Sequence, residues 1–440
     1  MTTPDTAGDA NARLVRTRWL LAGAGVLLQL SLGAVYAWSV FSKALQSKES
    51  VFALTKSQAA VPFSVTIGMI FLGSFVGGRL QDRRGPRLVA ITGGVVYAIG
   101  ILLAGLASTR GLFWLLILGY GVIAGFGLGL GYIVPVAMLQ KWFPDKRGLI
   151  TGIAVGGFGF GAVITSPIAQ VLVNHYKAVP TRSFLWLGFG YLILALVGAS
   201  FFRNPPEGFR VPGWQPATTG PVVTSGRDYS PPEALRGRHW YQLTAILTLN
   251  VTAGIALISV ASAASQDIAG LSSGAAATFV GVMGLFNGAG RIFWGAMSER
   301  LGRMVAFMAM LGIQGICFLI LPHATAPALF VILAALVYLC YGGGFGTMPA
   351  TAGDYFGLPN AGAIYGLMIV GWSIGGVIGP LLVAGLINGK VYTTAFTTIA
   401  VIALVAIALP LVTRVPGIRA KAAGAAEAAE AAPPTGAVSA

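Results

Sequence analysis

Arg291 and Asn287 are the residues of this chain whose types and spacing most directly predict chemistry. They lie four positions apart in the apolar run 272–297, so in a helix they share one face. A guanidinium binds a carboxylate through two parallel hydrogen bonds, and an amide can contact a hydroxyl or keto oxygen. The pair therefore predicts a binding site for a small organic acid.

Arg291 has no acidic companion in an apolar run. All 13 Asp and Glu residues, and all 3 His residues, fall in expected loops, tails or helix ends. Inserting an Arg at this depth of a bilayer costs on the order of 3 kcal/mol, so we expect it to meet a substrate carboxylate. Two alternatives remain open: Arg291 reaches the membrane surface on its long stem, and Asn287 makes an ordinary helix–helix hydrogen bond.

The composition identifies the elements that position these residues. Of 440 residues, 56% are hydrophobic and 9% charged, and 62 are glycines, which excludes an ordinary water-soluble surface and suits closely packed membrane helices. Most of the 28 Lys and Arg residues fall in alternate loops, which predicts that both termini are cytoplasmic. The net charge of +15 therefore indicates a lipid bilayer, and not nucleic acid, as the partner. The two cysteines match no disulfide or metal pattern.

Twelve apolar runs are long enough to cross a bilayer. The expected spans are 19–41, 59–79, 87–107, 112–139, 148–173, 184–202, 240–264, 272–297, 303–322, 327–350, 361–388 and 391–414.

The runs divide the chain into two bundles of six helices. We expect a cytoplasmic tail (1–18), an N-terminal bundle (19–202), a cytoplasmic linker (203–239), a C-terminal bundle (240–414) and a disordered cytoplasmic tail (415–440). Several prolines in the linker break any helical pattern there. The last tail has no apolar stripe.

An internal repeat supports this division. The segments 78–87 and 295–303 each carry a Gly and, four residues later, an acid. An Arg directly follows the acid, and a second Gly lies three residues after the acid. The first Gly permits close helix contact, the acid can accept from a helix N-terminus, and the last Gly permits a tight turn.

The repeat resembles the loop motif of the major facilitator superfamily, which implies a two-bundle fold. In that family the motif acts as a cytoplasmic gate, so the resemblance implies gating roles for Asp82, Arg83, Glu299 and Arg300. Met297 and Glu299 depart from the family's Leu and Asp. The alternative is that these charges only set the topology.

Two further runs resemble the oxalate:formate antiporter family and its monocarboxylate transporter relatives. In the first, Phe286 to Gly295, the resemblance implies that Arg291 binds the substrate carboxylate, while animal monocarboxylate transporters place an acid where this chain has Asn287. In the second, Tyr365 to Gly376, Trp372 stands where the oxalate exchanger has a lysine. One cation suits one carboxylate, which favours lactate or pyruvate over oxalate.

Three tyrosines resemble residues that line the same family's pocket: Tyr36, Tyr132 and Tyr341. Each supplies a hydroxyl donor and an apolar ring. Ordinary packing is the alternative role.

Together these observations predict an all-α membrane protein, monomeric, in a bacterial inner membrane. The predicted function is secondary active transport of a small monocarboxylate, by proton symport or anion exchange, with no cofactor, no metal and no enzymatic activity. Two alternatives stay open: a dicarboxylate antiporter of the oxalate/formate type, and a membrane carboxylate sensor that transports nothing.

Overall fold

Long apolar helices account for most of the chain. The computed structural model describes residues 4–213, 224–388 and 391–415. The N-terminal half contains α1 (Pro4–Gly33), η1 (Ala34–Ala37), α2 (Trp38–Gln46), α3 (Lys56–Arg84), α4 (Pro86–Gly105), η2 (Arg110–Leu112), α5 (Phe113–Leu116), η3 (Ile117–Ala124), α6 (Gly125–Trp142), α7 (Arg147–His175), η4 (Pro180–Arg182) and α8 (Ser183–Ser200).

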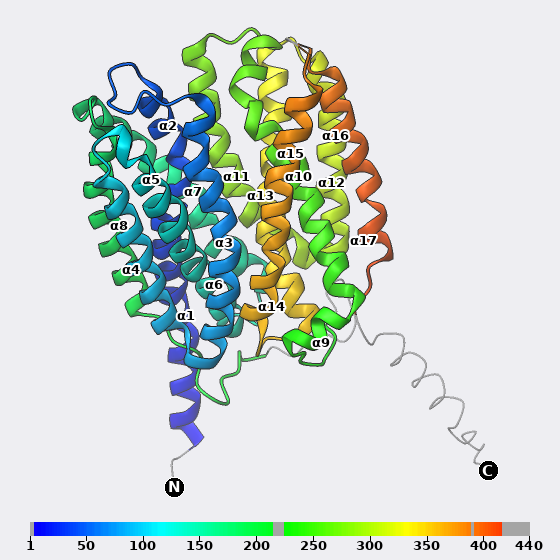
Figure 1. Cartoon of the computed structure of the whole chain (residues 1–440). Helices are drawn as coiled ribbons and strands as arrows, with labels where there is room; N and C mark the ends of the chain where they lie inside the picture. The colour runs from blue at the N-terminus through cyan, green and yellow to red at the C-terminus, as the bar shows by residue number, and fades with distance from the viewer. Residues whose placement is uncertain (1–3, 214–223, 389–390, 416–440) are drawn as a thin grey trace, which may run out of the picture.

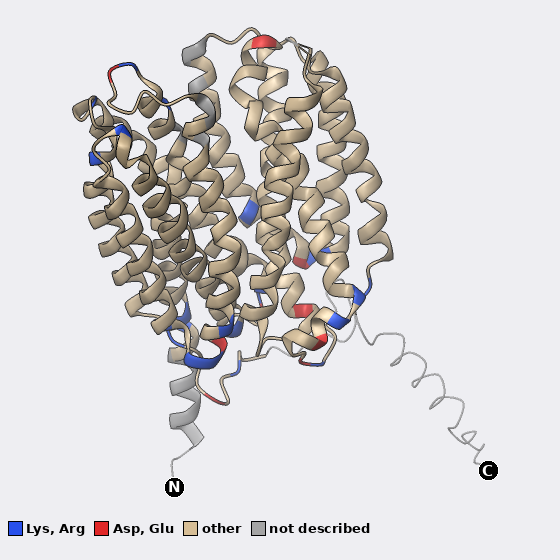
Figure 2. Ribbon diagram, viewed as in Figure 1, with Lys and Arg blue, Asp and Glu red and all other residues tan. Residues whose placement is uncertain are grey.

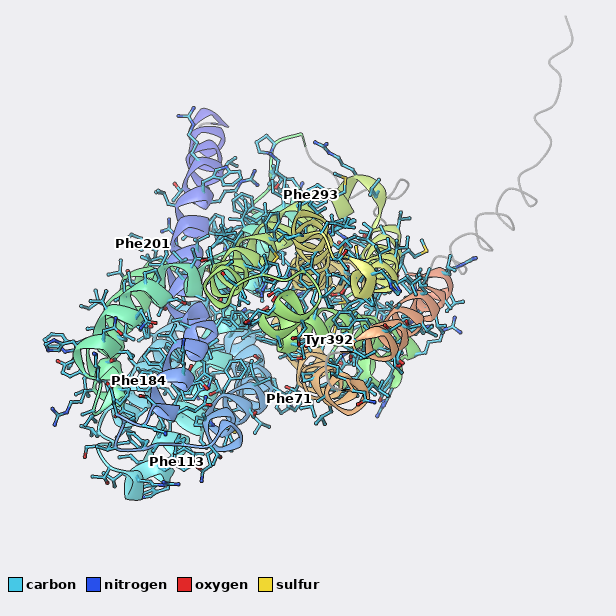
Figure 3. All side chains as sticks on the ribbon, turned by 90° about the horizontal axis from the view of Figure 1, so that it is seen from above. Phe71, Phe113, Phe184, Phe201, Phe293 and Tyr392 are labelled. Carbon is cyan, nitrogen blue, oxygen red and sulfur yellow. The ribbon has the colours of Figure 1, made fainter. Side chains whose placement is uncertain are left out.

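The C-terminal half follows a short helix, α9 (Pro231–Arg236). It contains α10 (Arg238–Asp267), α11 (Ser273–Leu301), α12 (Arg303–Ile320), η5 (Leu321–His323), α13 (Pro327–Phe356), α14 (Ala361–Met368), α15 (Val370–Leu386), α16 (Thr393–Ala406) and α17 (Ala408–Val412). Figure 1 shows the two halves side by side, with their long helices running roughly in the same direction. Figure 3, seen from above, shows the same two halves in a view down the helices.

Eleven helical segments in the described residues are long and apolar enough to span a membrane. They correspond to eleven of the twelve expected spans. The remaining one, 272–297, is the helix α11, which lies among the others (Figure 1) and contacts both α7 and α13. It carries the polar residues Asn287 and Arg291, and both are buried within the protein.

The structure departs from the expected helix limits at both ends of the N-terminal half. The first helix begins at Pro4, so most of the tail predicted for 1–18 continues the helix of the first span.

The linker contains the helix α9, contrary to the expectation that its prolines exclude one. Pro231 occupies the first helical turn, where its missing N–H costs nothing, and Ser230 and Glu233 form a capping box. The Ser230 backbone bond lowers the pKa of the Glu233 carboxyl. The predicted tail 415–440 lies almost entirely outside the described residues.

Charged residues gather near the two ends of the helices (Figure 2). The lower end in Figures 1 and 2 carries the α3–α4, α6–α7, α11–α12 and α13–α14 connections, and we call it the lower end throughout. Both repeated segments turn there. Gly85 and Gly302 have φ angles of 86° and 92°, a conformation that glycine adopts without strain. The expected tight turn is therefore confirmed in both copies.

Glycines bring the two halves into backbone contact along two helix pairs. In the α7–α11 pair, Gly152 packs against the Arg291 carbonyl and Gly148 against Gly295. In the α3–α14 pair, Gly78 packs against the Gly362 carbonyl. A side chain at these positions would collide with backbone, so small residues set the spacing of the halves.

Several spans are interrupted along their length, and two of these interruptions lie beside residues predicted to bind substrate. The first span passes from α1 through the 3-10 segment η1 before α2 begins. The eleventh is divided at Ile369, between α14 and α15. Tyr36 lies in the first interruption and Trp372 one turn after the second. Such breaks are tolerated at membrane depth where neighbouring protein covers the backbone.

The α7–α11 contact generates a first prediction. Replacing Gly152→Ala should lower stability by about 1–3 kcal/mol, because the new methyl group forces the helices apart. Gly190→Ala is the matched control, since a Cβ at Gly190 in α8 meets nothing within 4 Å. Thermal unfolding of the purified protein in detergent measures both. Equal unfolding temperatures for the two variants would contradict the assigned packing role.

Candidate functional site

Arg291 is buried in the middle section of the protein with part of its guanidinium unpaired. It lies ten residues before the end of α11, about 15 Å from the lower end, and its exposed fraction is 1%. Its Nη1 donates to the Val155 carbonyl at 3.1 Å and its Nε to Asn287 Oδ1 at 3.4 Å. Its Nη2 has no hydrogen-bond partner among the described residues.

The burial of Arg291 argues against the alternative in which its side chain reaches the membrane surface. The side chain does not extend to either end of the bundle, since it is held by α7 through Val155 and by its own helix through Asn287. Within the described residues no ion pair to Arg291 is formed. A buried, incompletely paired cation favours binding of an anion at this point.

Two phenylalanines from opposite halves flank the guanidinium. Phe158 of α7 lies 5.5 Å from the Arg291 carbon Cζ, measured to the ring centroid, and Phe345 of α13 lies 5.0 Å from it. Both rings have an exposed fraction of 0%. The faces of such rings attract a cation without neutralising it. They therefore stabilise the charge of Arg291 while leaving it able to pair with a carboxylate.

Polar aromatic residues surround the flanking rings. Tyr36 and Tyr132 of the N-terminal half each lie 5.3 Å from Phe158, edge to face. Trp372 lies 5.0 Å from Phe345 and 6.2 Å from Tyr132. The walls of the site thus come from both halves, which is the arrangement expected when two bundles move around a shared ligand.

Several buried donors of this cluster lack hydrogen-bond partners in the described part of the chain. They are the hydroxyls of Tyr36, Tyr132, Tyr341 and Tyr365 and the indole Nε1 of Trp372. All four hydroxyls lie near Arg291, with Tyr341 beside Tyr36 and Tyr365 beside Tyr132. Buried donors normally find acceptors. A carboxylate offers two oxygens and several lone pairs, so one small anion can accept from Arg291 and from neighbouring hydroxyls together.

All six residues predicted to bind substrate come together in this cluster: Arg291, Asn287, Tyr36, Tyr132, Tyr341 and Trp372. Sequence reasoning missed the flanking role of Phe158 and Phe345 and the participation of Tyr365. Phe345 follows Tyr341 by one helical turn, so the periodicity of α13 contained a signal for it.

The predicted gate residues lie apart from this cluster, at the lower end. Asp82 Oδ2 accepts from the Ala363 N–H, in the first turn of α14, at 3.0 Å. Glu299 Oε1 accepts from the Gly148 N–H, in the first turn of α7, at 2.6 Å. Each acid of the repeat therefore caps a helix of the opposite half. A carboxylate is stabilised there by the N–H groups and the helix dipole.

A second ionic connection at the lower end was not foreseen. Asp354, at the end of α13, binds Arg147 of the N-terminal half at 2.9 Å and Arg303 of its own half at 2.8 Å. Its exposed fraction is 2%. Arg303 also donates to Ser298 at 2.6 Å. Asp354 lies 51 residues from Arg303 in sequence, so no local pattern pointed to this triad.

The two arginines predicted for the gate are placed differently from the acids. Arg83 and Arg300 are exposed, and neither forms an ion pair within the described ranges. Lys141 is the cation that approaches Asp82, at 3.6 Å. The neighbouring arginine of each repeat therefore adds charge at the surface, and more distant residues supply the direct contacts.

Comparisons with known proteins agree with the fold. The family model described as Major Facilitator Superfamily matches residues 20–327 and 244–439. A solved structure of the transporter FucP in the outward conformation covers 90% of this chain and 98% of its own, with a TM-score of 0.69 at 18% identity. The predicted all-helical fold of this superfamily is thus confirmed.

Two curated relatives cover most of the chain. The oxalate:formate antiporter of Oxalobacter formigenes is 26% identical over 407 residues, which are 91% of this chain and 92% of that protein. The apicoplast pyruvate carrier 1 of Toxoplasma gondii is 24% identical and covers 82% of this chain and 83% of its own. With its family model and its helices in agreement, this chain belongs to the Major Facilitator Superfamily, as a multi-pass secondary transporter related to the oxalate:formate antiporter and the monocarboxylate transporters.

Proposed function

We propose that this transporter carries a small monocarboxylate of the lactate or pyruvate class, and that Arg291 binds its carboxylate. The observation that carries the proposal is the state of Arg291: it is 1% exposed, its Nη2 is unpaired, and no carboxylate of the described residues reaches it. Leaving a buried charge unpaired costs several kcal/mol. A substrate carboxylate supplies the missing negative charge and the missing acceptors at once.

The chemistry of the walls supports one carboxylate and not two. Around Arg291 the described residues bring phenyl, phenol and indole groups and the amide of Asn287. Trp372 occupies the position where the resemblance to the oxalate exchanger implies a lysine, and its ring packs on Phe345. A dicarboxylate would leave one charge uncompensated in a medium of low dielectric constant. The apolar rings instead suit the short hydrocarbon part of lactate or pyruvate.

Two modes of coupling are compatible with this site. None of the residues assembled around Arg291 is Asp, Glu or His, so a proton that crosses with the substrate travels on the acid itself or on water. Anion exchange follows if the unpaired Arg291 resists reorientation and the paired one does not. The name of the Oxalobacter formigenes relative, an antiporter, is consistent with exchange. We propose that the membrane in which it works is a bacterial inner membrane.

The first test replaces the cation. Arg291→Gln should lose about 2–5 kcal/mol of substrate binding, the cost of truncating a buried charge pair, and uptake below saturation should fall by roughly 30-fold or more. Proteoliposome uptake of labelled lactate, pyruvate, formate and oxalate measures this. Arms with a pH gradient or an internal anion separate symport from exchange.

The matched control for this test is Arg110→Gln, which removes an exposed arginine and should leave uptake unchanged. Unaltered transport in Arg291→Gln would remove Arg291 from the site. Binding of a carboxylate by the wild type without any uptake would instead support the sensor alternative.

A second test addresses specificity through Trp372. Trp372→Lys places a second cation beside Phe345, so oxalate uptake should rise relative to lactate uptake by at least tenfold, while Trp372→Phe should keep the preference for lactate. The ratio of the two uptake rates in the same vesicles measures the change. Strong oxalate exchange by the wild type would contradict the monocarboxylate proposal.

We further propose that Asp82 and Glu299, together with Asp354, form a gate that closes the lower end. Asp354→Asn leaves Arg147 and Arg303 without their shared carboxylate, so the closed arrangement should become less populated. Spin labels at Leu88→Cys and Leu301→Cys report the separation, because both positions are exposed and lie at the lower end in opposite halves. The buried Cys317 and Cys340 are replaced by Ala in this background.

Pulsed electron resonance should then show at least a twofold larger population at long distance in Asp354→Asn. Glu49→Gln, which removes an exposed acid away from the lower end, should leave the distribution unchanged. Identical distributions in Asp354→Asn and the parent protein would refute the gate.

A further inference from the structure

The second part of the linker is bound to the end of α13. The N–H of Ser225 donates to the Asp354 carbonyl and the N–H of Tyr229 to the Phe356 carbonyl, each at 2.9 Å. Both carbonyls belong to the last turn of α13, where a helix provides no partners of its own. The linker therefore completes the hydrogen bonding of this helix end.

The same segment also holds the turn that follows α13. Asn360 Nδ2 donates to the Tyr229 carbonyl at 2.9 Å, and the Tyr229 ring packs edge-on against Phe356 at 5.7 Å. Asp228 lies directly against Gly357, whose φ angle is 83°. We call residues 225–229 together with Asn360 the linker dock.

The turn held by the linker dock lies between two contacts of the proposed gate. On one side, the Asp354 carboxylate binds Arg147. On the other side, the Ala363 N–H binds Asp82. These two residues are nine positions apart, and both reach across to the N-terminal half. Their relative placement depends on the conformation of the intervening turn, which is where the dock binds.

We infer that Tyr229 and Asn360 are positioning residues for the gate: they hold the α13–α14 turn so that Asp354 and Ala363 meet their partners in the N-terminal half together. The inference rests on the proposed gate. It assigns the linker a part in the transport cycle beyond joining the halves, since loss of the dock weakens two interdomain contacts at once.

The linker has a second attachment in the N-terminal half. Trp142, at the end of α6, donates from Nε1 to the Arg203 carbonyl at 2.7 Å, and its ring lies 5.0 Å from Phe209. The linker is thus bound to the lower end of both halves. Among the described residues, only its attachment to the C-terminal half contacts the α13–α14 turn. We therefore expect substitutions in the linker dock to change the gate.

The experiment uses the full chain with the Leu88→Cys and Leu301→Cys labels. Asn360→Asp keeps the size of the side chain and removes the Nδ2 donor, and Tyr229→Ala removes the ring contact. Each should raise the long-distance population at least twofold, in the same direction as Asp354→Asn. Phe201→Ala, which removes an aromatic ring that is 55% exposed, is the matched control and should cause no shift.

Thermal unfolding separates positioning from simple loss of structure. A dock variant that unfolds at a lower temperature with an unchanged distance distribution would overturn the inference. If Asp354→Asn shifts the distances and the dock variants do not, the inference fails and the gate stands. If Asp354→Asn itself causes no shift, the gate and the inference fall together.

Discussion

The burial of one cation without a protein counter-charge is the constraint on which the rest of this structure depends. Arg291 is held by a carbonyl of α7 and an amide of its own helix, and two rings cover it from opposite halves. These contacts give hydrogen-bond acceptors to part of the guanidinium, but none of them supplies a negative charge. The site is therefore stable enough to form and still favours an anion.

The same residue links recognition to the packing of the two halves. The backbone carbonyl of Arg291 lies against Gly152 of α7, and its side chain bonds to Val155 of the same helix. A change in the pairing of the guanidinium therefore acts at the main contact between the halves. About 12 Å below, Glu299 on the same helix caps the start of α7. One helix pair thus connects the proposed substrate site with the proposed gate.

Much of this arrangement was predictable because hydrophobic length and glycine spacing report on helices directly. The all-helical fold and the two repeated turns at Gly85 and Gly302 were predicted correctly, since both depend on local sequence. The helix α9 was missed because its capping box was outweighed by the surrounding prolines. Asp354 was missed because its partners are far away in sequence and only the packed halves bring them together.

The convergence of Tyr36, Tyr132, Tyr341 and Trp372 on Arg291 was expected only from a family resemblance. The hydrophobic pattern placed each of them in an expected span, but it could not predict that their side chains meet around one residue. That Arg83 and Arg300 remain exposed could not be read from the repeat, because the motif specifies residue types and not the rotation of each helix end. The role of these residues in transport stays a prediction.

The most direct measurement compares equilibrium binding of lactate and of its uncharged amide, lactamide, to the purified protein. The two molecules have nearly the same shape and differ in the charge that Arg291 is proposed to bind. Lactate should bind and lactamide should bind at least roughly 30-fold more weakly, the lower limit for loss of a buried charge pair. Equal affinities would contradict the claim that the substrate carboxylate is the missing partner of Arg291.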